Sequence, residues 1–76
     1  MIQFTMPKLG HLMEEGMISV WHKKEGERVE KGEILLDVET DKSVIPVESN
    51  ISGVLYKILV HEGEAVPVNA LIAIII

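Results

Sequence analysis

The sequence predicts an all-β domain, built as a small closed sandwich from two related halves with about four short strands each. Three observations predict this class. Apolar and polar residues alternate over short runs, which is the pattern of half-buried strands. The chain repeats itself at a constant offset of 37 residues, and no stretch keeps a helical period for longer than one turn.

The repeat consists of short motifs that match between the two halves. Gly16-Met17-Ile18 corresponds to Gly53-Val54-Leu55, and 53 − 16 = 37. The same offset relates three further pairs: Glu25-Gly26-Glu27 with Glu62-Gly63-Glu64, Val29 with Val66, and Ile34-Leu35 with Leu71-Ile72. Gly32 corresponds to Asn69, and these two residue types best tolerate a positive φ. Two copies are too few for a solenoid, so the halves are expected to cover each other.

Each strand is expected where an apolar run lies between turn residues. The longer strands are expected near residues 2–6, 17–24, 34–40, 44–48, 54–60 and 71–75, with short pieces near 28–30 and 65–67. The turns between them are expected at residues 25–27, 31–33, 50–53 and 62–64, each of which contains glycine. Pro46 cannot donate a ladder hydrogen bond, so its position is expected to face outward at a sheet edge.

One lysine is expected at the tip of a hairpin between the strands 34–40 and 44–48. A two-residue turn at Asp41 and Lys42 puts the apolar residues of these strands opposite one another, Val38 with Ile45 and Leu36 with Val47. A shift of one residue would break this shared face, because successive strand residues point to opposite sides. The amine of Lys42 is therefore expected to lie clear of the core.

The symmetry also predicts where the termini and one long loop lie. The Asp41-Lys42 connection joins the two halves, and its symmetry mate would join residue 76 to residue 1. Both termini are therefore expected together, at the end opposite Lys42. The connection between Met6 and Gly16 is longer than its counterpart in the second half, so the residues Lys8 to Glu15 are extra and form the candidate recognition loop.

The length and the net charge indicate a single small domain and argue against several classes of partner. Seventy-six residues make one small domain, and a net charge of −5 argues against nucleic acid or an anionic membrane as a partner. No apolar run reaches the roughly 18 residues of a membrane span, and the N-terminus lacks the pattern of a signal peptide. The apolar run 71–76 stops at the chain end, so a domain excised from a longer chain is expected.

The residue types show no pattern of a catalytic or metal site. The chain has no cysteine, so no disulfide and no thiolate site is expected. Neither a glycine-rich phosphate loop nor a nucleophile–base pair is visible. His11, His22 and His61 are scattered, with no carboxylate or cysteine at metal-ligand spacing, so they are expected on the surface. Trp21 is expected to serve packing.

A set of short motifs extends along nearly the whole chain. It consists of Met6 to Gly10, Glu15-Gly16, Trp21, Lys24 to Glu27, Val29, Lys31 to Glu33, Glu39 to Lys42, Ser49, Gly53 and Glu62-Gly63. Together these motifs resemble the lipoyl domain of 2-oxo-acid dehydrogenase acyltransferases, within the biotinyl/lipoyl carrier family. The motifs before Trp21 look most like the pyruvate and acetoin branches. The resemblance implies a flattened barrel or sandwich of two four-stranded antiparallel sheets with quasi-two-fold symmetry, a barrel-sandwich hybrid.

The resemblance also implies a cofactor and a set of partners. Lipoate would be joined to Lys42 by an amide, through a lipoate ligase or lipoyl transferase. The arm would serve a thiamine-diphosphate-dependent decarboxylase or dehydrogenase, a catalytic acyltransferase domain with coenzyme A, and dihydrolipoamide dehydrogenase. Residues 1–76 would be a carrier domain, without catalysis of its own, from the N-terminus of a dihydrolipoyllysine-residue acetyltransferase. The expected compartment is the cytoplasm of a bacterium or the mitochondrial matrix of a eukaryote.

Residues around the lysine are candidates for recognition by partners: Glu39, Asp41 and Ser43 on the hairpin, and Leu12, Met13, Glu14 and Glu15 on the loop. An apolar residue of this loop could instead pack on the barrel as a lid. Three other assignments stay open: a biotinyl carrier domain, the lipoylated but longer glycine-cleavage carrier protein, and an unmodified β-sandwich adaptor that acts through loop 8–15. The biotinyl family usually places its lysine between two methionines, whereas Asp41 and Ser43 flank Lys42.

Overall fold

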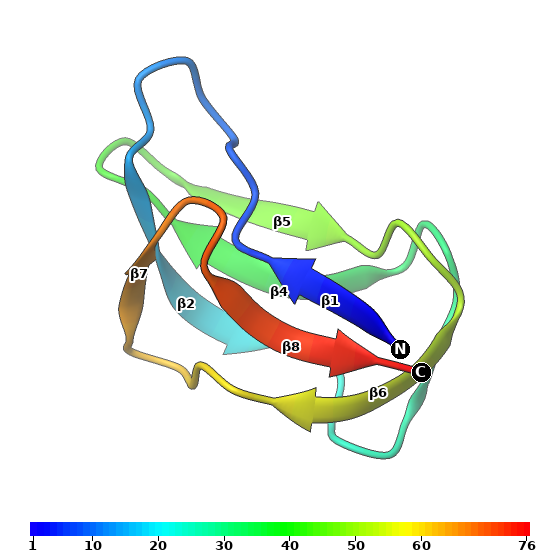
Figure 1. The fold of residues 1–76 in the computed structure, drawn as a ribbon. Coiled ribbons are helices and arrows are strands. Elements are labelled where there is room, and N and C mark those ends of the chain that lie inside the picture. Colours follow the sequence, from blue (N-terminus) through cyan, green and yellow to red (C-terminus); the bar gives the residue numbers. More distant parts are fainter.

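All of residues 1–76 are described by the computed structural model, which contains eight strands and no helix (Figure 1). The strands are β1 (Ile2–Thr5), β2 (Glu15–Trp21), β3 (Arg28–Val29), β4 (Ile34–Glu39), β5 (Val44–Glu48), β6 (Gly53–Ile58), β7 (Ala65–Pro67) and β8 (Leu71–Ile75). The predicted all-β class and all eight predicted strands are confirmed. The largest difference is in β2, which begins and ends earlier than the expected range 17–24. No segment forms a helix of the length and apolar character that a bilayer crossing requires.

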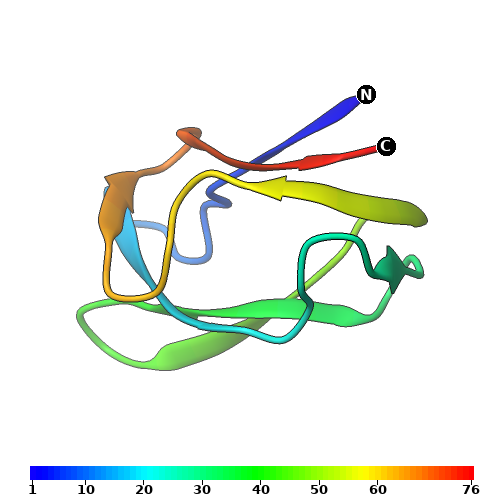
Figure 2. The same cartoon turned by 90° about the horizontal axis from the view of Figure 1, so that it is seen from below.

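The strands form two four-stranded antiparallel sheets. The two sheets face each other as separate layers in the view from below (Figure 2). One sheet has the order β1-β8-β6-β3 and the other the order β5-β4-β2-β7. Each strand therefore has its symmetry mate at the same place in the opposite sheet, which confirms the predicted two-fold relation. The short strands β3 and β7 pair with strands of the other half, so the two halves interlock. No ladder joins the two sheets, so the fold is a sandwich and not a closed barrel.

The core between the sheets contains twelve buried apolar side chains: Phe4, Met6, Ile18, Val29, Leu35, Leu36, Val38, Val47, Leu55, Ile72, Ala73 and Ile75. The neighbours Leu35 and Leu36 are both buried, although simple alternation predicts that they face opposite sides. A register shift in the β4–β5 pair turns Leu35 inward. Ile72 and Ala73, their symmetry mates, are both buried where the β1–β8 register also shifts. The bulge is thus part of the repeat.

The turn before β4 and its mate before β8 require a left-handed backbone. Gly32 has a φ of 93°, and Asn69 at the matching position has a φ of 76°. Asn69 is the one residue other than glycine with a positive φ. The predicted equivalence of these two residues is confirmed, because glycine and asparagine adopt this conformation at the lowest steric cost.

Two glutamates fasten the halves to each other in a reciprocal way. The Oε2 atom of Glu25 accepts a hydrogen bond of 2.8 Å from the backbone N–H of Ile58. The Oε2 atom of Glu62 accepts one of 2.9 Å from the backbone N–H of Trp21. Each donor is the last residue of a long strand, β2 or β6, and the short strands β7 and β3 pair only with the first residues of these strands. The first glutamate of each Glu-Gly-Glu motif therefore links its own half to the other half, in addition to the turn that the motif forms.

The two termini lie side by side, at the end of the molecule opposite the β4–β5 hairpin (Figure 1). Ile2 pairs with Ile75 in the β1–β8 ladder. The last residue, Ile76, exchanges two backbone hydrogen bonds with Val54, of 2.9 and 2.8 Å. The predicted separation of the termini from Lys42 is confirmed. A chain that continues from either end would leave the hairpin unobstructed.

The reciprocal glutamates predict equal losses of stability when either is removed. Glu25→Ala leaves the backbone N–H of Ile58 without its carboxylate partner, and Glu62→Ala does the same at Trp21. Water can reach these groups, so the expected loss is about 1 kcal/mol for each variant, below the full value of a charged hydrogen bond. The free energy of unfolding is measured by urea denaturation.

Glu48→Ala is the matched control, because Glu48 is exposed on the edge strand β5 and its side chain makes no hydrogen bond or ion pair. Its unfolding free energy should change by less than about 0.5 kcal/mol. A clear loss at Glu25 with none at Glu62 would contradict the symmetric arrangement.

Candidate functional site

The hairpin between β4 and β5 has the register that the sequence predicts. The observed cross-strand partners include Val38 with Ile45 and Leu36 with Val47. Pro46 is exposed opposite Asp37, on the edge strand of its sheet, so its expected outward edge position is also confirmed. The ladder ends where the N–H of Thr40 donates to the carbonyl oxygen of Ser43, at 2.8 Å. Asp41 and Lys42 are therefore the two residues at the tip.

One side chain braces this turn from within. The Thr40 hydroxyl oxygen accepts hydrogen bonds from the backbone N–H groups of Lys42 and Ser43, both at 3.2 Å. It also donates to the carbonyl oxygen of Ser43, at 3.1 Å. A threonine at this place satisfies amides that a short turn would leave to water. Thr40 was not among the residues expected at the site, which were Glu39, Asp41 and Ser43 on the hairpin, although a hydroxyl residue directly before a two-residue tip is a turn signal.

The side chain of Lys42 is exposed and has no partner in the structure. The three ion pairs are His22 with Asp37, Lys23 with Glu33, and Arg28 with Glu30. Neither Asp41 nor Glu39 pairs with Lys42, although both are close in sequence. The remaining lysines lie on other turns, on strand β6 or on the loop before β2, and none of them occupies a hairpin tip. Lys42 is thus a free amine in a position that no other lysine shares.

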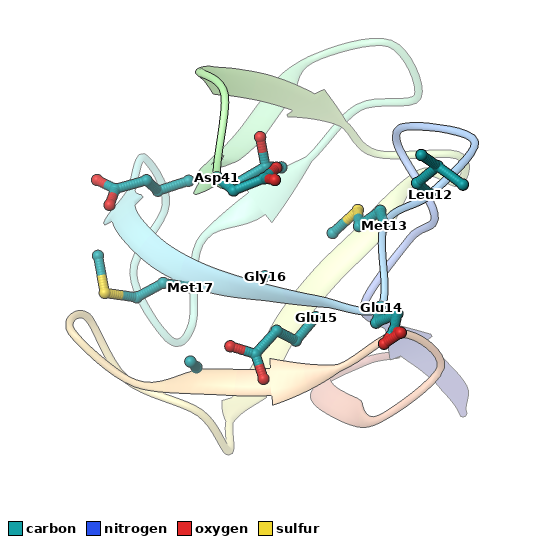
Figure 3. Close-up of a pocket in the computed structure, with 10 residues that line it drawn as sticks. Leu12, Met13, Glu14, Glu15, Gly16, Met17 and Asp41 are labelled. Carbon is teal, nitrogen blue, oxygen red and sulfur yellow. The ribbon is translucent and has the colours of Figure 1, made fainter.

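The loop before β2 folds beside this hairpin, as expected, and two shallow grooves lie between them. The tip groove has a volume of about 410 Å³ and is lined by Leu9, Leu12 and Met13 of the loop and Thr40, Lys42 and Ile45 of the hairpin. The acidic groove has a volume of about 380 Å³ and is lined by Glu14, Glu15, Glu39 and Asp41 together with Met13 and Met17 (Figure 3). Lys42 lines the tip groove and not the acidic groove. The structure therefore brings the predicted site residues to one end of the molecule.

The two apolar residues at the loop tip have different surroundings. Leu12 is 82% exposed, whereas Met13 is half-buried and packs against the core together with Leu9. In Figure 3 the side chain of Met13 extends inward from the loop, and Leu12 lies at its outer bend. The expectation that the fold does not need residues 8–15 is therefore wrong for Leu9 and Met13, which cover the end of the core. Leu12 remains free for contact with another molecule.

The acidic residues at the end of the loop belong partly to a sheet. Glu15 is the first residue of β2 and lies opposite Pro67 of β7. The carbonyl oxygen of Glu14 accepts a hydrogen bond of 3.0 Å from the N–H of Val68. The predicted loop boundary at Glu15 was therefore too late. Both carboxylate side chains are nevertheless exposed and remain available to a partner.

Gly16 lets the loop and the hairpin approach each other. A Cβ atom at this position would lie 2.7 Å from Cγ1 of Val38 and 2.8 Å from Cε of Met13. Its symmetry mate, Gly53, is equally tight, since a Cβ atom there would lie 2.5 Å from the carbonyl oxygen of Ile76. The repeat identified both glycines, but only the structure shows that close packing, and not a turn, requires them.

Of the three histidines and Trp21, only His11 lies near the Lys42 hairpin, on the loop before β2. All three histidines are exposed, as expected, and only His11 is on the recognition loop. The fold brings Nε2 of His22 within 3.0 Å of Oδ1 of Asp37, a pairing that sequence spacing does not reveal. No group of three potential metal-ligating side chains is present. The indole N–H of Trp21 donates to the carbonyl oxygen of Val60 at 3.0 Å, and the ring packs against the core, which confirms its packing role.

The carboxyl groups with shifted pKa values lie at the other end of β4. A hydrogen bond from the Arg28 side chain lowers the pKa of Glu30. A hydrogen bond from the backbone N–H of Glu30, with a further one from Lys23, lowers the pKa of Glu33. Both groups serve the turn that leads into β4.

Comparison with known proteins identifies the family. The family model described as "Biotin-requiring enzyme" matches residues 2–75. The chain is 43% identical over 76 residues to the dihydrolipoyllysine-residue acetyltransferase component of a pyruvate dehydrogenase complex from Rickettsia bellii. It is 46% identical over 72 residues to the corresponding component of the acetoin cleaving system of Pseudomonas putida. These matches cover 99% and 95% of the chain but only 18% and 20% of the relatives, so the chain spans about a fifth of their length.

A solved structure agrees with these relatives. The lipoyl domain of the 2-oxoglutarate dehydrogenase complex from Azotobacter vinelandii superposes with a TM-score of 0.80 at 33% sequence identity. The match covers 100% of this chain and 96% of that domain. The two chains thus share their whole fold and not a fragment of it. With its symmetric sandwich and single hairpin-tip lysine, the chain belongs to the biotinyl/lipoyl family and is a lipoyl domain.

Proposed function

We propose that Lys42 carries lipoate in amide linkage and that the domain is the mobile carrier of a 2-oxo-acid or acetoin dehydrogenase complex. The observation that supports this most is the exposed, unpaired lysine at the tip of a braced two-residue turn. The chain has no cysteine, so the lipoyl dithiolane would supply the redox-active sulfurs that it lacks. The domain would act as a carrier and not as a catalyst.

The residues at the tip fit such an attachment. The register of β4 and β5 holds the amine away from the core, and no side chain competes for it. Acylation would turn a charged ammonium into a neutral amide and change the net charge from −5 to −6. Glu39, Asp41 and Ser43 are exposed beside the lysine, so a lipoate ligase or lipoyl transferase can read them.

The position of the termini supports a role as a tethered carrier. Both lie at the end opposite Lys42, so flanking chain can hold the domain while the lysine points away (Figure 1). A flexible tether raises the concentration of the lysine near each active site to the millimolar range, on the order of what short linkers give. The fold therefore separates the point of attachment to a complex from the point of chemistry.

The names of the relatives suggest the rest of the assembly. Because the chain matches about a fifth of two acetyltransferase components, we infer that it is one module of a dihydrolipoyllysine-residue acetyltransferase, with residues 1–76 as the carrier. Its partners would then be a thiamine-diphosphate-dependent decarboxylase, the acyltransferase domain with coenzyme A, and dihydrolipoamide dehydrogenase. Leu12, with Glu14 and Glu15 beside it, offers the decarboxylase an exposed apolar contact with an acidic border.

The description of the matching family favours biotin as a second candidate group. The same hairpin geometry would present a biotinyl lysine equally well. The residues beside the lysine distinguish the two, since Asp41 and Ser43 stand where biotinyl domains usually have methionines. We therefore prefer lipoate. Modification assays with a lipoate ligase and a biotin ligase distinguish the two groups.

Incubation with a lipoate ligase should add one lipoyl group per chain, and peptide mass mapping should place it on Lys42. Lys42→Arg should remain unmodified, because no other lysine lies at a hairpin tip. Lys57→Ala is the matched control and should be modified at the rate of the parent domain. Biotin ligase should leave the parent domain unmodified. Lipoylation of Lys42→Arg at a comparable rate, or efficient biotin transfer to the parent, would contradict the proposal.

Thr40 should act as a positioning residue for this reaction. Thr40→Val removes the hydroxyl that bonds two tip amides but keeps the shape of the side chain, whereas Thr40→Ser keeps the hydroxyl. A net loss of about 1 kcal/mol corresponds to roughly fivefold easier opening of the turn. Solvent exchange of the Thr40 amide, which bonds to Ser43, should accelerate by about that factor in Thr40→Val, with slower lipoylation.

Thr40→Ser should stay within about twofold of the parent in both measurements, because its oxygen can accept the same bonds. Equal exchange and equal lipoylation in Thr40→Val and the parent would show that the backbone alone holds the turn.

A further inference from the structure

The tip groove has four apolar lining residues, and its other lining residues, Asp41 among them, are polar or glycine. Leu12 is 82% exposed, and the partly buried side chains Leu9, Met13 and Ile45 continue the apolar surface below it. Lys42 itself forms part of the same groove. A free ammonium prefers water to such a surface, but the hydrocarbon stem of a lysine packs on apolar groups readily.

We propose that the tip groove is a docking site for the lipoyl group on Lys42, so that the arm rests against its own domain between visits to partners. This inference rests on the proposed lipoylation of Lys42. Acylation removes the charge that keeps the lysine end in water and adds an apolar chain and ring at the mouth of the groove. Leu12 and Met13, which line the groove, then contact this chain.

The covalent link to Lys42 favours the attached lipoyl group over any free molecule as the occupant of the tip groove. Because Lys42 lines the groove, its attached group stays at a local concentration on the order of millimolar or higher. An intrinsic affinity in the millimolar range is therefore enough to populate the docked and the free arm comparably. Such weak docking leaves the arm available to partner active sites.

The acidic groove does not compete for the arm. It is lined by four carboxylates, from Glu14, Glu15, Glu39 and Asp41, whereas only Asp41 of these also lines the tip groove. Lys42 lines only the tip groove. An apolar chain placed there would desolvate charged groups without giving them partners, which is unfavourable. Although Leu12 and Met13 line both grooves, the tip groove has fewer carboxylates and is the one that Lys42 itself lines.

The test begins with the domain lipoylated by a lipoate ligase and with Lys42 confirmed as the site by peptide mass. The rate at which a small water-soluble phosphine reduces the dithiolane is then compared with the rate for free lipoamide. Docking should slow reduction by about two- to fivefold, since only the free arm is open to the reagent. Lipoylation should also shift the methyl NMR signals of Leu12 and Met13 and give nuclear Overhauser contacts from them to the ring.

Leu12→Ser should return the reduction rate to within about 20% of free lipoamide, because it removes the most exposed apolar side of the groove. The matched control is Leu59→Ser, which changes an exposed leucine outside both grooves and should keep the slow rate. Neither measurement involves a protein partner, so loss of partner recognition cannot imitate loss of docking.

The outcomes separate this inference from the proposed function. A chain that gains no lipoyl mass at Lys42 would overturn both. A lipoylated domain that is reduced as fast as free lipoamide, with unshifted Leu12 and Met13 methyl signals, would overturn the docking and leave the carrier function standing. Concentration-dependent shifts of these methyl groups in the unlipoylated domain would assign the groove to a second copy of the chain instead.

Discussion

The pairing of β4 with β5 is the constraint on which the site depends. Leu36 and Val38 are buried, and a slip of one residue would carry both to the solvent face. The register is therefore fixed by the burial of these side chains far more firmly than by the turn itself. Because the register is fixed, the chain must reverse at Asp41 and Lys42, and this places the lysine at the hairpin tip. The core of the sandwich thus determines the position of an exposed amine.

The two ends of the molecule differ, although its two halves are related by an approximate two-fold symmetry. At the end opposite the hairpin, the equivalent strands β8 and β1 are not joined by a turn, and residues 76 and 1 lie there instead (Figure 1). At the hairpin end, the long connection before β2 has no equal in the second half. Met13 fastens this connection to the core, and Gly16 lets it lie close to β4, so Leu12 is presented beside Lys42 on a supported loop. The hairpin tip with Lys42 is thereby flanked by a loop surface that the second half of the domain lacks.

Most of the fold follows from sequence because its signals are local and occur twice. The hairpin register, the equivalence of Gly32 and Asn69, and the place of the termini all come from alternation and the repeat. Three features do not. The bulge that buries Leu35 and the contact of His22 with Asp37 arise from cross-strand geometry, which spacing along the chain does not encode. The different surroundings of neighbouring loop residues depend on which one meets the core, and no periodicity marks that choice.

The most direct measurement inserts one glycine between Asp41 and Lys42. The insertion lengthens the turn and displaces the lysine, but it should leave the ladder and the core in place, because exposed loop tips tolerate insertions. We expect the insertion variant to have an unfolding midpoint within a few degrees of the parent. Its rate of lipoylation should fall about tenfold or more, because the displaced lysine is rarely held in the productive position. A folded insertion variant that is lipoylated at the parent rate would show that hairpin geometry does not select the lysine.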